Sequence, residues 1–495
     1  MNRRELLFIT AALLIGGALW FVVNLEPVWE LAWFVPGLLF VLALETGGWT
    51  SRGLVAIAAL VGAASNYRYF LSVMPMGPAL MVLLLQTLMW MAIYGVARRI
   101  VKSFESAWTV LALPIVAVAM DTLLAHLTPD GNWGSLAYTQ AEVLPVAQLA
   151  SVFGVGGVLF LLMLGNSTIA LGLVYGKRLP GSVPMYIAVL VTLSLALGFG
   201  AWRLGAAESG ASQGTPVSFG IASVDDFIIG PQSEKSRDVW TQYEAQVQEL
   251  AASGAHIVLL PEKIDVLQKP GAESRQAWLS RLARANRVWL VAGLGVVDDG
   301  VKRNEAWWFA PDGRLVTRYV KHFMAPPERE FTAGHEYPVN DIAGVRYGVA
   351  ICKDMHFSRL GREFGRRGAR VMLVPAWDFD RDAAMAANMT RMRGVESGYL
   401  VVRASRDGLL SITDAYGRVL ASDRSGSLPG TTLFATVNVG PALATIYTRI
   451  GDSLGWSCVP AAIAWLLAAY WRMRRARTIA GLNVSPISGP PAASG

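Results

Sequence analysis

The chain contains two cysteines, Cys352 and Cys458, which stand in different surroundings. Cys458 lies inside a hydrophobic stretch, where we expect it to pack as a small apolar residue. Cys352 directly follows the apolar run 347–351. The spacing of the two fits neither a disulfide framework nor a zinc motif. A thiol that ends such a run becomes a nucleophile once it is deprotonated, so Cys352 is the candidate nucleophile.

Two further polar residues follow apolar runs in the same way. Glu262 comes after residues 256–261, and Lys321 comes after residues 315–320. Rigid strands hold geometry while their ends open to a cleft, and catalytic groups are often placed there. A carboxylate can take the proton of a thiol, and an ammonium group can stabilise the oxyanion that forms when a thiolate attacks a carbonyl. One charged residue at a strand end is usually only solvated, so the prediction depends on the joint occurrence of all three.

Metal and nucleotide chemistry have little support in the sequence. The five histidines show no ligand spacing such as His-Glu-x-x-His, so we predict no metal and no other cofactor. His322 lies beside Lys321, and His356 lies near Cys352 in the sequence. For both, the alternative to a metal ligand is a supporting hydrogen bond at the site. Residues 154–157 read Gly-Val-Gly-Gly, but they lie in a hydrophobic stretch with no preceding strand and no following lysine. We therefore expect close helix packing there.

The elements that must position these residues belong to a membrane protein. Of the 495 residues 53% are hydrophobic and 16% are charged, whereas about a quarter of the residues of soluble domains are charged. Apolar segments of about 17 to 25 residues can cross a bilayer as helices. The candidate segments are 5–24, 31–44, 53–65, 77–97, 107–124, 146–175, 183–202 and, much later, 454–470. The second and third of these are short, which is typical of a re-entrant or tilted pair.

Lysine and arginine collect on one side of these segments, as they do in the cytoplasmic loops of membrane proteins. This bias places the N-terminus and the C-terminal flank inside and the stretch from about 204 to 448 outside. The net charge of +7 then reflects topology and predicts no nucleic acid partner. No small-residue cleavage site follows the first segment, so we expect it to be retained. Residues 478–495 are rich in Pro, Ser, Gly and Ala and are expected to be disordered.

Between the seventh and eighth segments, short β-branched runs alternate with amphipathic helices, which predicts an α/β domain. The predicted organisation is a membrane domain over 1–204, a catalytic domain over 205–448, a last transmembrane helix with its basic flank over 449–477, and the tail. Predicted helices cover 234–252, 274–285, 358–367 and 381–396. Predicted strands cover 217–224, 256–260, 288–297, 305–309, 315–320, 345–351, 370–374, 399–404 and 409–413.

The order of the three candidate residues resembles that of the nitrilase, or carbon–nitrogen hydrolase, superfamily. The resemblance implies a Glu262-Lys321-Cys352 triad on an α-β-β-α sandwich, inserted before the last transmembrane helix. It also implies a second acid, for which Glu328 fits the motif better than Glu330. The residues that carry it are Pro261-Glu262, Lys321 with Pro326 and Glu328 downstream, and Gly-Val-Ala-Ile-Cys at 348–352.

Other segments are similar to the bacterial apolipoprotein N-acyltransferase branch of that superfamily. They are 389–396, 399–405 and 412–419 in the catalytic domain, and 131–140 and 145–158 in the membrane domain. The resemblance implies that an acyl chain moves from a membrane phospholipid, through a thioester on Cys352, to the N-terminal amine of a diacylglyceryl-cysteine lipoprotein. It implies a multi-pass protein of the bacterial inner membrane with its catalytic domain on the periplasmic side. We expect the protein to act as a monomer.

Three features differ from that branch. Lys353 and Asp354 follow Cys352, where the branch usually has Tyr and Glu, and the stretch between Lys321 and Cys352 is shorter. Lys263 follows the proposed base and would lower its basicity if the side chain turned toward the site. The alternative function is therefore a membrane-anchored amidase that hydrolyses a C–N bond in a more polar, open cleft. For the transferase, the candidates for an apolar surface that excludes water are Trp307, Trp308, Trp377 and Phe379.

Overall fold

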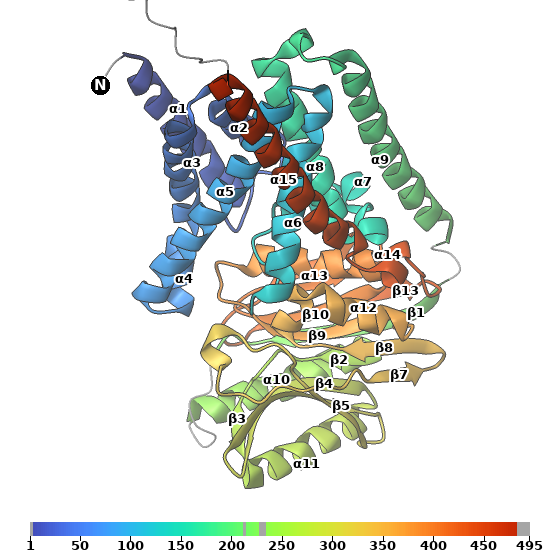
Figure 1. Ribbon diagram of the computed structural model, residues 1–495. Coiled ribbons are helices and arrows are strands. Elements are labelled where there is room, and N and C mark those ends of the chain that lie inside the picture. Colours follow the sequence, from blue (N-terminus) through green and yellow to red (C-terminus); the bar gives the residue numbers. More distant parts are fainter. Residues whose placement is uncertain (1–2, 211–213, 227–233, 483–495) are drawn as a thin grey trace, which may run out of the picture.

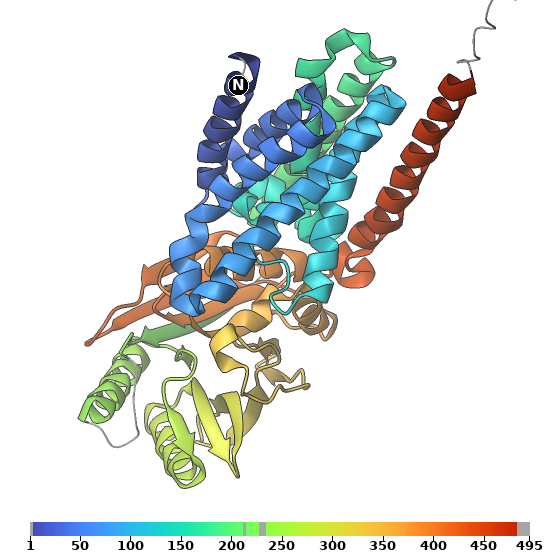
Figure 2. The ribbon, with the colours of Figure 1, turned by 60° about the vertical axis from the view of Figure 1, so that its left-hand side comes forward.

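The structure is a computed structural model that describes residues 3–210, 214–226 and 234–482. Helices form one end of the molecule, and two sheets with their own helices form the other (Figure 1). Seen after a 60° turn, α15 (Ser453–Leu482) stands at one edge of the helical end and α1 (Arg3–Val23) at the opposite edge (Figure 2). The prediction of a disordered tail over 478–495 is wrong for residues 478–482, which continue the last helix, and the rest of the tail lies outside the described residues. The helices of this end are α1 (Arg3–Val23), α2 (Val35–Glu45), α3 (Gly48–Ala63), α4 (Tyr67–Val73), α5 (Met76–Phe104), α6 (Ala112–Leu127), α7 (Leu144–Ala147), α8 (Ala150–Val174), α9 (Ser182–Gly210) and α15 (Ser453–Leu482).

Seven helical segments of the described chain are long and apolar enough to cross a bilayer, and an eighth, Leu31–Glu45, is apolar but shorter. All eight predicted segments are helical, and the second is short as predicted. The prediction of a short third segment is wrong. Helix α3 continues through a 3-10 turn into α4, so that this stretch, Gly48–Val73, reaches 26 residues. Polar residues at the junction, Asn66 and Arg68, hid the continuation from the hydropathy pattern.

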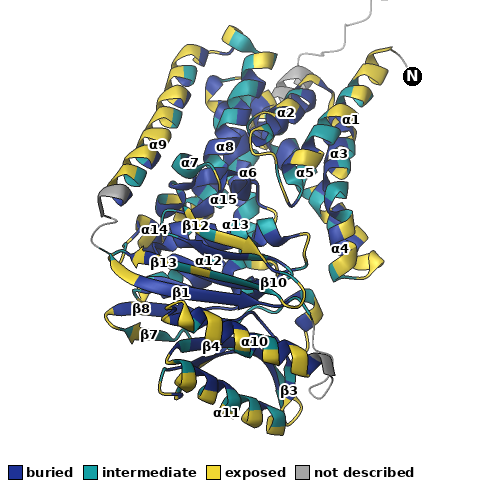
Figure 3. Ribbon diagram, turned by 180° about the vertical axis from the view of Figure 1, so that it is seen from behind, coloured by how far each residue is buried: buried dark blue, intermediate teal, exposed yellow. Residues whose placement is uncertain are grey.

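Large apolar side chains cover the outside of the helical end. Leu84 on α5 is 56% exposed, and Leu190 and Leu195 on α9 are 65% and 67% exposed. Figure 3 shows exposed residues along the outer face of α9, whereas the strands of the α/β end are largely buried. A surface this apolar is unfavourable in water and matches the hydrocarbon of a bilayer. The helical end is therefore the membrane domain.

Two sheets stack face to face in the α/β end. In one sheet the strand order is β13-β1-β2-β4-β5-β6 with β3 beside β4, and in the other it is β12-β11-β10-β9-β8-β7. The strands are β1 (Thr215–Ser223), β2 (Ile257–Leu259), β3 (Val266–Gln268), β4 (Trp289–Asp298), β5 (Val301–Phe309), β6 (Leu315–Val320), β7 (Val339–Ile342), β8 (Val345–Val349), β9 (Val371–Trp377), β10 (Leu400–Arg406), β11 (Leu409–Thr413), β12 (Val419–Arg424) and β13 (Thr431–Val439).

The alternation of side chains along the strands builds two separate cores. Phe219, Ile221 and Trp308 point between the sheets and pack with residues such as Leu373. Their neighbours, such as Trp307, point the other way and pack under the outer helices. Figure 1 shows α10 (Glu234–Ala252) and α11 (Lys269–Asn286) on one outer face and α12 (Ser358–Arg366) and α13 (Ala383–Ser397) on the other. The predicted α-β-β-α sandwich is confirmed.

All nine predicted strands and all four predicted helices of this domain are present. The strands that sequence analysis missed are β3, β7, β12 and β13. Strand β12 is half-exposed or exposed throughout, and β13 alternates weakly, so neither shows a clear apolar run. Pairing holds β13 in place, since it lies antiparallel to β1 from Thr215 opposite Val439 to Ser223 opposite Thr431.

Helix α13 lies against α8 of the membrane domain, and one glycine makes this contact possible. Gly154 has φ 66° and ψ −173° and interrupts the helical conformation near the start of α8. The break frees the N–H of Val155, which donates a hydrogen bond to Oε1 of Glu396 at 2.8 Å. A Cβ on Gly154 would lie 2.6 Å from a ring carbon of Tyr447 in α14 (Ile446–Ile450). Close packing was predicted here, but the neighbour at Gly154 belongs to α14 and not to another membrane-spanning helix.

Gly154→Ala is expected to lower the thermal unfolding midpoint in detergent by about 4 °C or more. Backbone in this region of φ and ψ costs any other residue about 1 to 3 kcal/mol, and the contact with Tyr447 adds to that. The matched control is Gly156→Ala, because a Cβ there meets only Val118, at 3.7 Å. Equal midpoints for the two variants would show that the break at Gly154 is not required. Tryptophan fluorescence during heating measures both.

Candidate active site

The structure brings the three predicted residues together at one end of the stacked sheets. Glu262 follows β2 after Leu260 and Pro261, Lys321 follows β6, and Cys352 begins the 3-10 turn after β8. Strands β2 and β6 belong to one sheet and β8 to the other, so the site lies where the two sheets meet. Glu262 is 2% exposed and Lys321 is 1% exposed, whereas Cys352 is half-buried.

Lys321 is held between two carboxylates. Its Nζ donates to Oε1 of Glu262 at 2.6 Å and to Oε2 of Glu328 at 2.7 Å. Nδ2 of Asn304 lies 2.6 Å from Oε1 of Glu262 and 2.8 Å from Oε1 of Glu328. Charges this deeply buried are stable only when they are paired and hydrogen-bonded. The four side chains therefore form one charged cluster, which we call the Lys321 cluster.

The pairing keeps Lys321 and Glu328 charged. Burial alone would lower the pKa of Lys321, but the carboxylates of Glu262 and Glu328 outweigh burial and raise it well above its ordinary value. Burial would raise the pKa of Glu328, but Lys321 and Lys263 together lower it to about 2. At neutral pH the cluster thus holds a positive charge on Lys321 beside a negative charge on Glu328.

The second acid and Lys263 are also placed by the structure. Glu328 lies in the Lys321 cluster, whereas the alternative, Glu330, has its side chain 75% exposed and pairs with Lys302. Lys263 has a left-handed backbone, φ 46°, and its Nζ donates to Oε1 of Glu328 at 2.7 Å. Its charge is therefore directed at Glu328 and not at Glu262.

The backbone of Cys352 is left-handed as well, with φ 45°. The carboxylate of Asp354 holds this turn, because it accepts hydrogen bonds from the N–H groups of Ile351 at 3.0 Å and Phe323 at 2.9 Å and from the hydroxyl of Tyr319 at 2.6 Å. Strained backbone at a nucleophile is found where the surrounding structure fixes its direction. Asp354 thus fixes the conformation of the turn that carries Cys352.

The thiol of Cys352 is protonated at rest. Burial and the negative charge of Glu262 raise the pKa of Cys352 well above its ordinary value, although Lys321 acts in the opposite direction. Its Sγ lies 3.5 Å from the carbonyl oxygen of Trp377. A protonated thiol is a poor nucleophile, so this site needs a base that takes the proton as the bond to the substrate forms.

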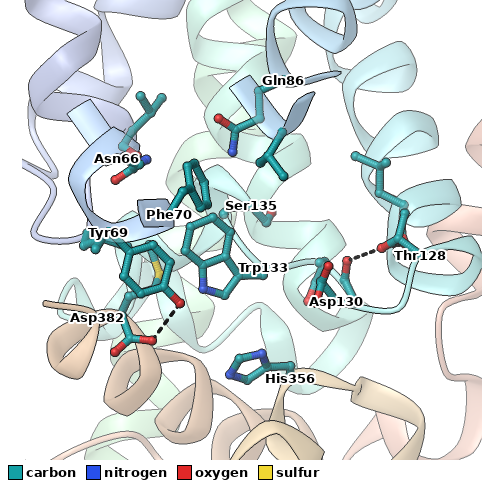
Figure 4. A pocket seen from close by; sticks show the side chains of 18 of the residues that line it. Asn66, Tyr69, Phe70, Gln86, Thr128, Asp130, Trp133, Ser135, His356 and Asp382 are labelled. Atoms are coloured by element: carbon teal, nitrogen blue, oxygen red, sulfur yellow. Dashed lines mark hydrogen bonds between the residues drawn. The ribbon is translucent and has the colours of Figure 1, made fainter. Parts of the chain in front are cut away.

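A cavity of about 490 Å³ connects Cys352 with the membrane domain. Apolar residues of the helices, including Leu19, Leu85 and Met89, form its upper wall, and the catalytic domain forms its floor. Figure 4 shows residues of both domains around this space. Trp377 and Phe379 line the cavity as predicted, but the prediction for Trp307 and Trp308 is wrong. Both are fully buried in the cores on the two faces of their sheet, because they are consecutive in β5 and point in opposite directions.

Sequence reasoning missed several polar contacts of the site. Asn304 lies within β5, and nothing in the local pattern marks it as a partner of two carboxylates. Lys353 is buried and donates to Oδ1 of Asp130, 2.6 Å away in the loop after α6, so it ties the cysteine turn to the membrane domain. Arg403 on β10 pairs with Asp378, which also lines the cavity. Each contact joins segments far apart in the chain, and one sequence carries no signal for such pairs.

The two histidines near the site differ. Nε2 of His322 lies 2.9 Å from the carbonyl oxygen of Glu336, away from the cavity lining. His356 lines the cavity, and burial and nearby cations lower its pKa well below the ordinary value. Within the described ranges, His, Cys, Asp and Glu form no group of three or more that is arranged to hold a metal ion.

Two family models match the chain. Residues 15–168 match the apolipoprotein N-acyltransferase N-terminal domain, and residues 228–439 match carbon–nitrogen hydrolase.

An apolipoprotein N-acyltransferase of Geobacter metallireducens is 26% identical over 396 residues, which are 73% of this chain and 74% of the relative. That of Vibrio vulnificus is 23% identical over 74% of this chain and 75% of its own length. An omega-amidase of Xenopus tropicalis is 26% identical over 35% of this chain and 75% of its own length. The amidase match covers about a third of this chain, whereas the matches to the two acyltransferases cover about three quarters of it. The chain belongs to the apolipoprotein N-acyltransferase family within the carbon–nitrogen hydrolase superfamily.

Proposed function

We propose that this N-acyltransferase works through a thioester on Cys352, with Glu262 as proton carrier and Lys321 as oxyanion partner. One observation carries the proposal: the Lys321 cluster lies beside a protonated thiol whose cavity reaches in among the membrane helices. The sulfur of Cys352 therefore lies beside the charged groups that acyl transfer requires and beside an apolar cavity that can hold an acyl chain.

In the first half-reaction Glu262 takes the proton of Cys352 as the sulfur attacks an ester carbonyl of a phospholipid. Negative charge then develops on the carbonyl oxygen, and the ammonium group of Lys321 stabilises it. One such donor contributes about 3 to 4 kcal/mol to the transition state. When the tetrahedral intermediate collapses, Glu262 returns the proton to the leaving alkoxide. The products are an acyl thioester on Cys352 and a lysophospholipid.

In the second half-reaction the α-amino group of a diacylglyceryl-cysteine attacks the thioester. Glu262 takes a proton from the amine, the C–N bond forms, and the C–S bond breaks. The proton then goes to the leaving thiolate, so Cys352 and Glu262 return to their starting states. Because the first product leaves before the second substrate reacts, the kinetics are expected to be ping-pong.

The apolar cavity favours transfer over hydrolysis. A thioester in contact with water would be hydrolysed, whereas exclusion of water leaves the amine as acceptor. The amidase alternative requires a more polar and open cleft, and residues such as Leu19, Leu85 and Met89 line this one. We further propose that the catalytic domain lies on the periplasmic side of the inner membrane, in line with the distribution of Lys and Arg. One chain supplies the whole cluster and cavity, so we propose that a monomer is active.

The test is to incubate the purified protein in detergent with phospholipid and to search by mass spectrometry for an acyl group on Cys352 that hydroxylamine removes. The adduct is expected on the wild type and on Cys458→Ser, which keeps the nucleophile, and not on Cys352→Ala. Addition of a diacylated lipopeptide should then remove the adduct and yield a triacylated product. Absence of the adduct on folded wild-type protein would overturn the proposal. If the adduct forms but its acyl group is released only as free fatty acid, the result favours the amidase.

A further inference from the structure

A second carboxylate lies on the wall of the same cavity, away from the Lys321 cluster. Asp382 comes directly before α13 and is 5% exposed. Its Oδ1 accepts from the N–H of Phe379 at 2.8 Å, and its Oδ2 accepts from the hydroxyl of Tyr69 on α4 at 3.0 Å. Figure 4 shows this contact across the cavity between the catalytic domain and the membrane domain. The proposed mechanism assigns Asp382 no task.

Asp382 has no ion-pair partner of its own in the described part of the chain, although Arg403, which pairs with Asp378, acts on its charge from further away. Of the three other carboxylates that line the cavity, Asp130 pairs with Lys353 and Asp378 with Arg403, whereas Asp121 is hydrogen-bonded by Ser135 and Asn132. Among the described residues no cationic side chain makes an ion pair with Asp382. A carboxylate has about four lone-pair sites, and the two neutral donors here fill two of them. A buried charge without a partner is costly, so the remaining sites are available to a cation that enters the cavity.

The groups around Asp382 are the kind that surround bound ammonium ions. The ring of Trp133 stacks on Tyr69 with centroids 5.5 Å apart and planes 11° apart, and Phe379 meets Tyr69 edge-on at 6.5 Å. Trp133 and Phe379 also line the cavity. Aromatic faces attract cations, and more strongly where water is excluded. An acidic group beside an aromatic wall therefore favours a cation over a neutral group.

An unused acceptor points to the same kind of ligand. Nδ1 of His356 is buried and has no hydrogen-bond partner among the described atoms. His356 lines the cavity, and Figure 4 shows it below Trp133, as Asp382 lies below Tyr69. Burial and the nearby charge of Lys353 keep its pKa low and the ring neutral, so a ring nitrogen is free to accept. An ammonium group carries three donors and matches a carboxylate and a neutral imidazole together.

We infer that Asp382, the wall of Tyr69, Trp133 and Phe379, and His356 form a binding site for a primary ammonium group of a substrate beside Cys352. The inference rests on the proposed function, because both proposed substrates can bring such a group. The acceptor binds with an α-ammonium, which releases one proton to solvent before the resulting amine attacks the thioester, and a donor such as phosphatidylethanolamine carries an ammonium in its head group. Burial and the neighbouring Asp378 raise the pKa of Asp382 to about 6, so the carboxylate is mostly ionised at neutral pH.

The experiment measures binding without catalysis, on the full chain carrying Cys352→Ala in detergent micelles. In each of two pairs of probes one member carries the ammonium group and the other lacks it: a diacylated lipopeptide with a free or an N-acetylated α-amine, and phosphatidylethanolamine or phosphatidylglycerol with the same acyl chains. Titration followed by tryptophan fluorescence gives Kd for each. At least one pair is expected to show about tenfold tighter binding of the ammonium form, and Asp382→Asn should remove that preference.

The affected pair identifies the source of the ammonium. Loss of preference in the lipopeptide pair assigns the site to the acceptor, and loss in the phospholipid pair assigns it to the donor head group. Asparagine keeps an acceptor oxygen for the N–H of Phe379, whereas it removes the charge and places an NH2 group where Oδ2 accepts from Tyr69. Glu330→Gln, which removes an exposed carboxylate outside the cavity, is the control and should keep the preference.

The inference is overturned if the nucleophile-free chain shows no preference in either pair, or if Asp382→Asn leaves every preference unchanged. If Asp382→Asn does not fold, as judged by its melting curve, Tyr69→Phe and Phe379→Leu carry the test. Each should reduce the preference about threefold or more, and unchanged values in both would overturn the inference. Failure of the wild type to form a thioester would refute the proposed function alone, because these affinities do not depend on chemistry at Cys352.

Discussion

Glu262→Gln is expected to slow formation of the thioester on Cys352 about a thousandfold. Burial and Glu262 itself keep the thiol protonated, so the reaction requires a base at the moment of attack. In the wild type Nζ of Lys321 donates to Oε1 of Glu262 at 2.6 Å. Glutamine is nearly the same size as glutamate and keeps an oxygen for this hydrogen bond, but its amide cannot take a proton from the thiol. Loss of a negative charge near the sulfur favours ionisation of the thiol, and this gain is much smaller than the loss of the base.

Single-turnover mass spectrometry with excess phospholipid measures this rate directly. Glu330→Gln is the matched control, since it removes an exposed carboxylate that pairs with Lys302 outside the cluster, and it should react at the wild-type rate. If Glu262→Gln reacts within tenfold of the wild type while folded, Glu262 is not the base. The remaining carboxylate of the Lys321 cluster, Glu328, would then be the next candidate.

Lys321→Met is expected to abolish measurable acyl transfer and to destabilise the fold. Removal of an oxyanion donor alone costs about 10²- to 10³-fold in rate. Removal of one partner from a buried ionic group costs about 3 to 5 kcal/mol, because Glu262 and Glu328 would keep buried charges without their shared cation. The unfolding midpoint should therefore fall by about 6 °C or more. Lys302→Met is the control, since its exposed pair with Glu330 contributes little.

The stability deficit of Lys321→Met should depend on pH. In the wild type the lowered pKa of Glu328 contributes stability that is present above its ordinary pKa and is lost as pH falls toward about 2. The variant lacks the part of that contribution that comes from Lys321 and keeps the part that comes from Lys263. The deficit should thus be largest near pH 7 and smaller near pH 4, as measured by melting curves in detergent. A deficit that grows as pH falls would contradict the charge balance assigned to the cluster.

The parts of this site that could be predicted are those that follow a local pattern. Glu262, Lys321 and Cys352 each follow an apolar run, and the resemblance to a superfamily indicated their order. The structure places Glu328 rather than Glu330 in the cluster, which agrees with the better fit of Glu328 to the motif. The fold was predictable for the same reason, since its buried strands are continuous apolar runs.

The parts that could not be predicted depend on contacts between distant segments. Trp307 and Trp308 have the same residue type, and only their alternation in β5 sends each into a different core and neither into the cavity. Lys353 departs from the family pattern, and its partner, Asp130, lies 223 positions earlier in the chain. Asp382 and Tyr69 meet across 313 positions. Residue type alone does not indicate such partners, because many pairings are compatible with the same sequence.

The break at Gly154 has a consequence for the order of assembly. The N–H of Val155 receives its acceptor from Glu396, 241 positions later in the chain. During synthesis the helix around Val155 enters the bilayer before Glu396 has been made, and an unpaired amide in hydrocarbon is unfavourable. We therefore expect α8 to reach its final packing only after the catalytic domain has folded against it. Packing of the membrane helices is thus expected to depend on the C-terminal half of the chain, because that half supplies the acceptor for Val155.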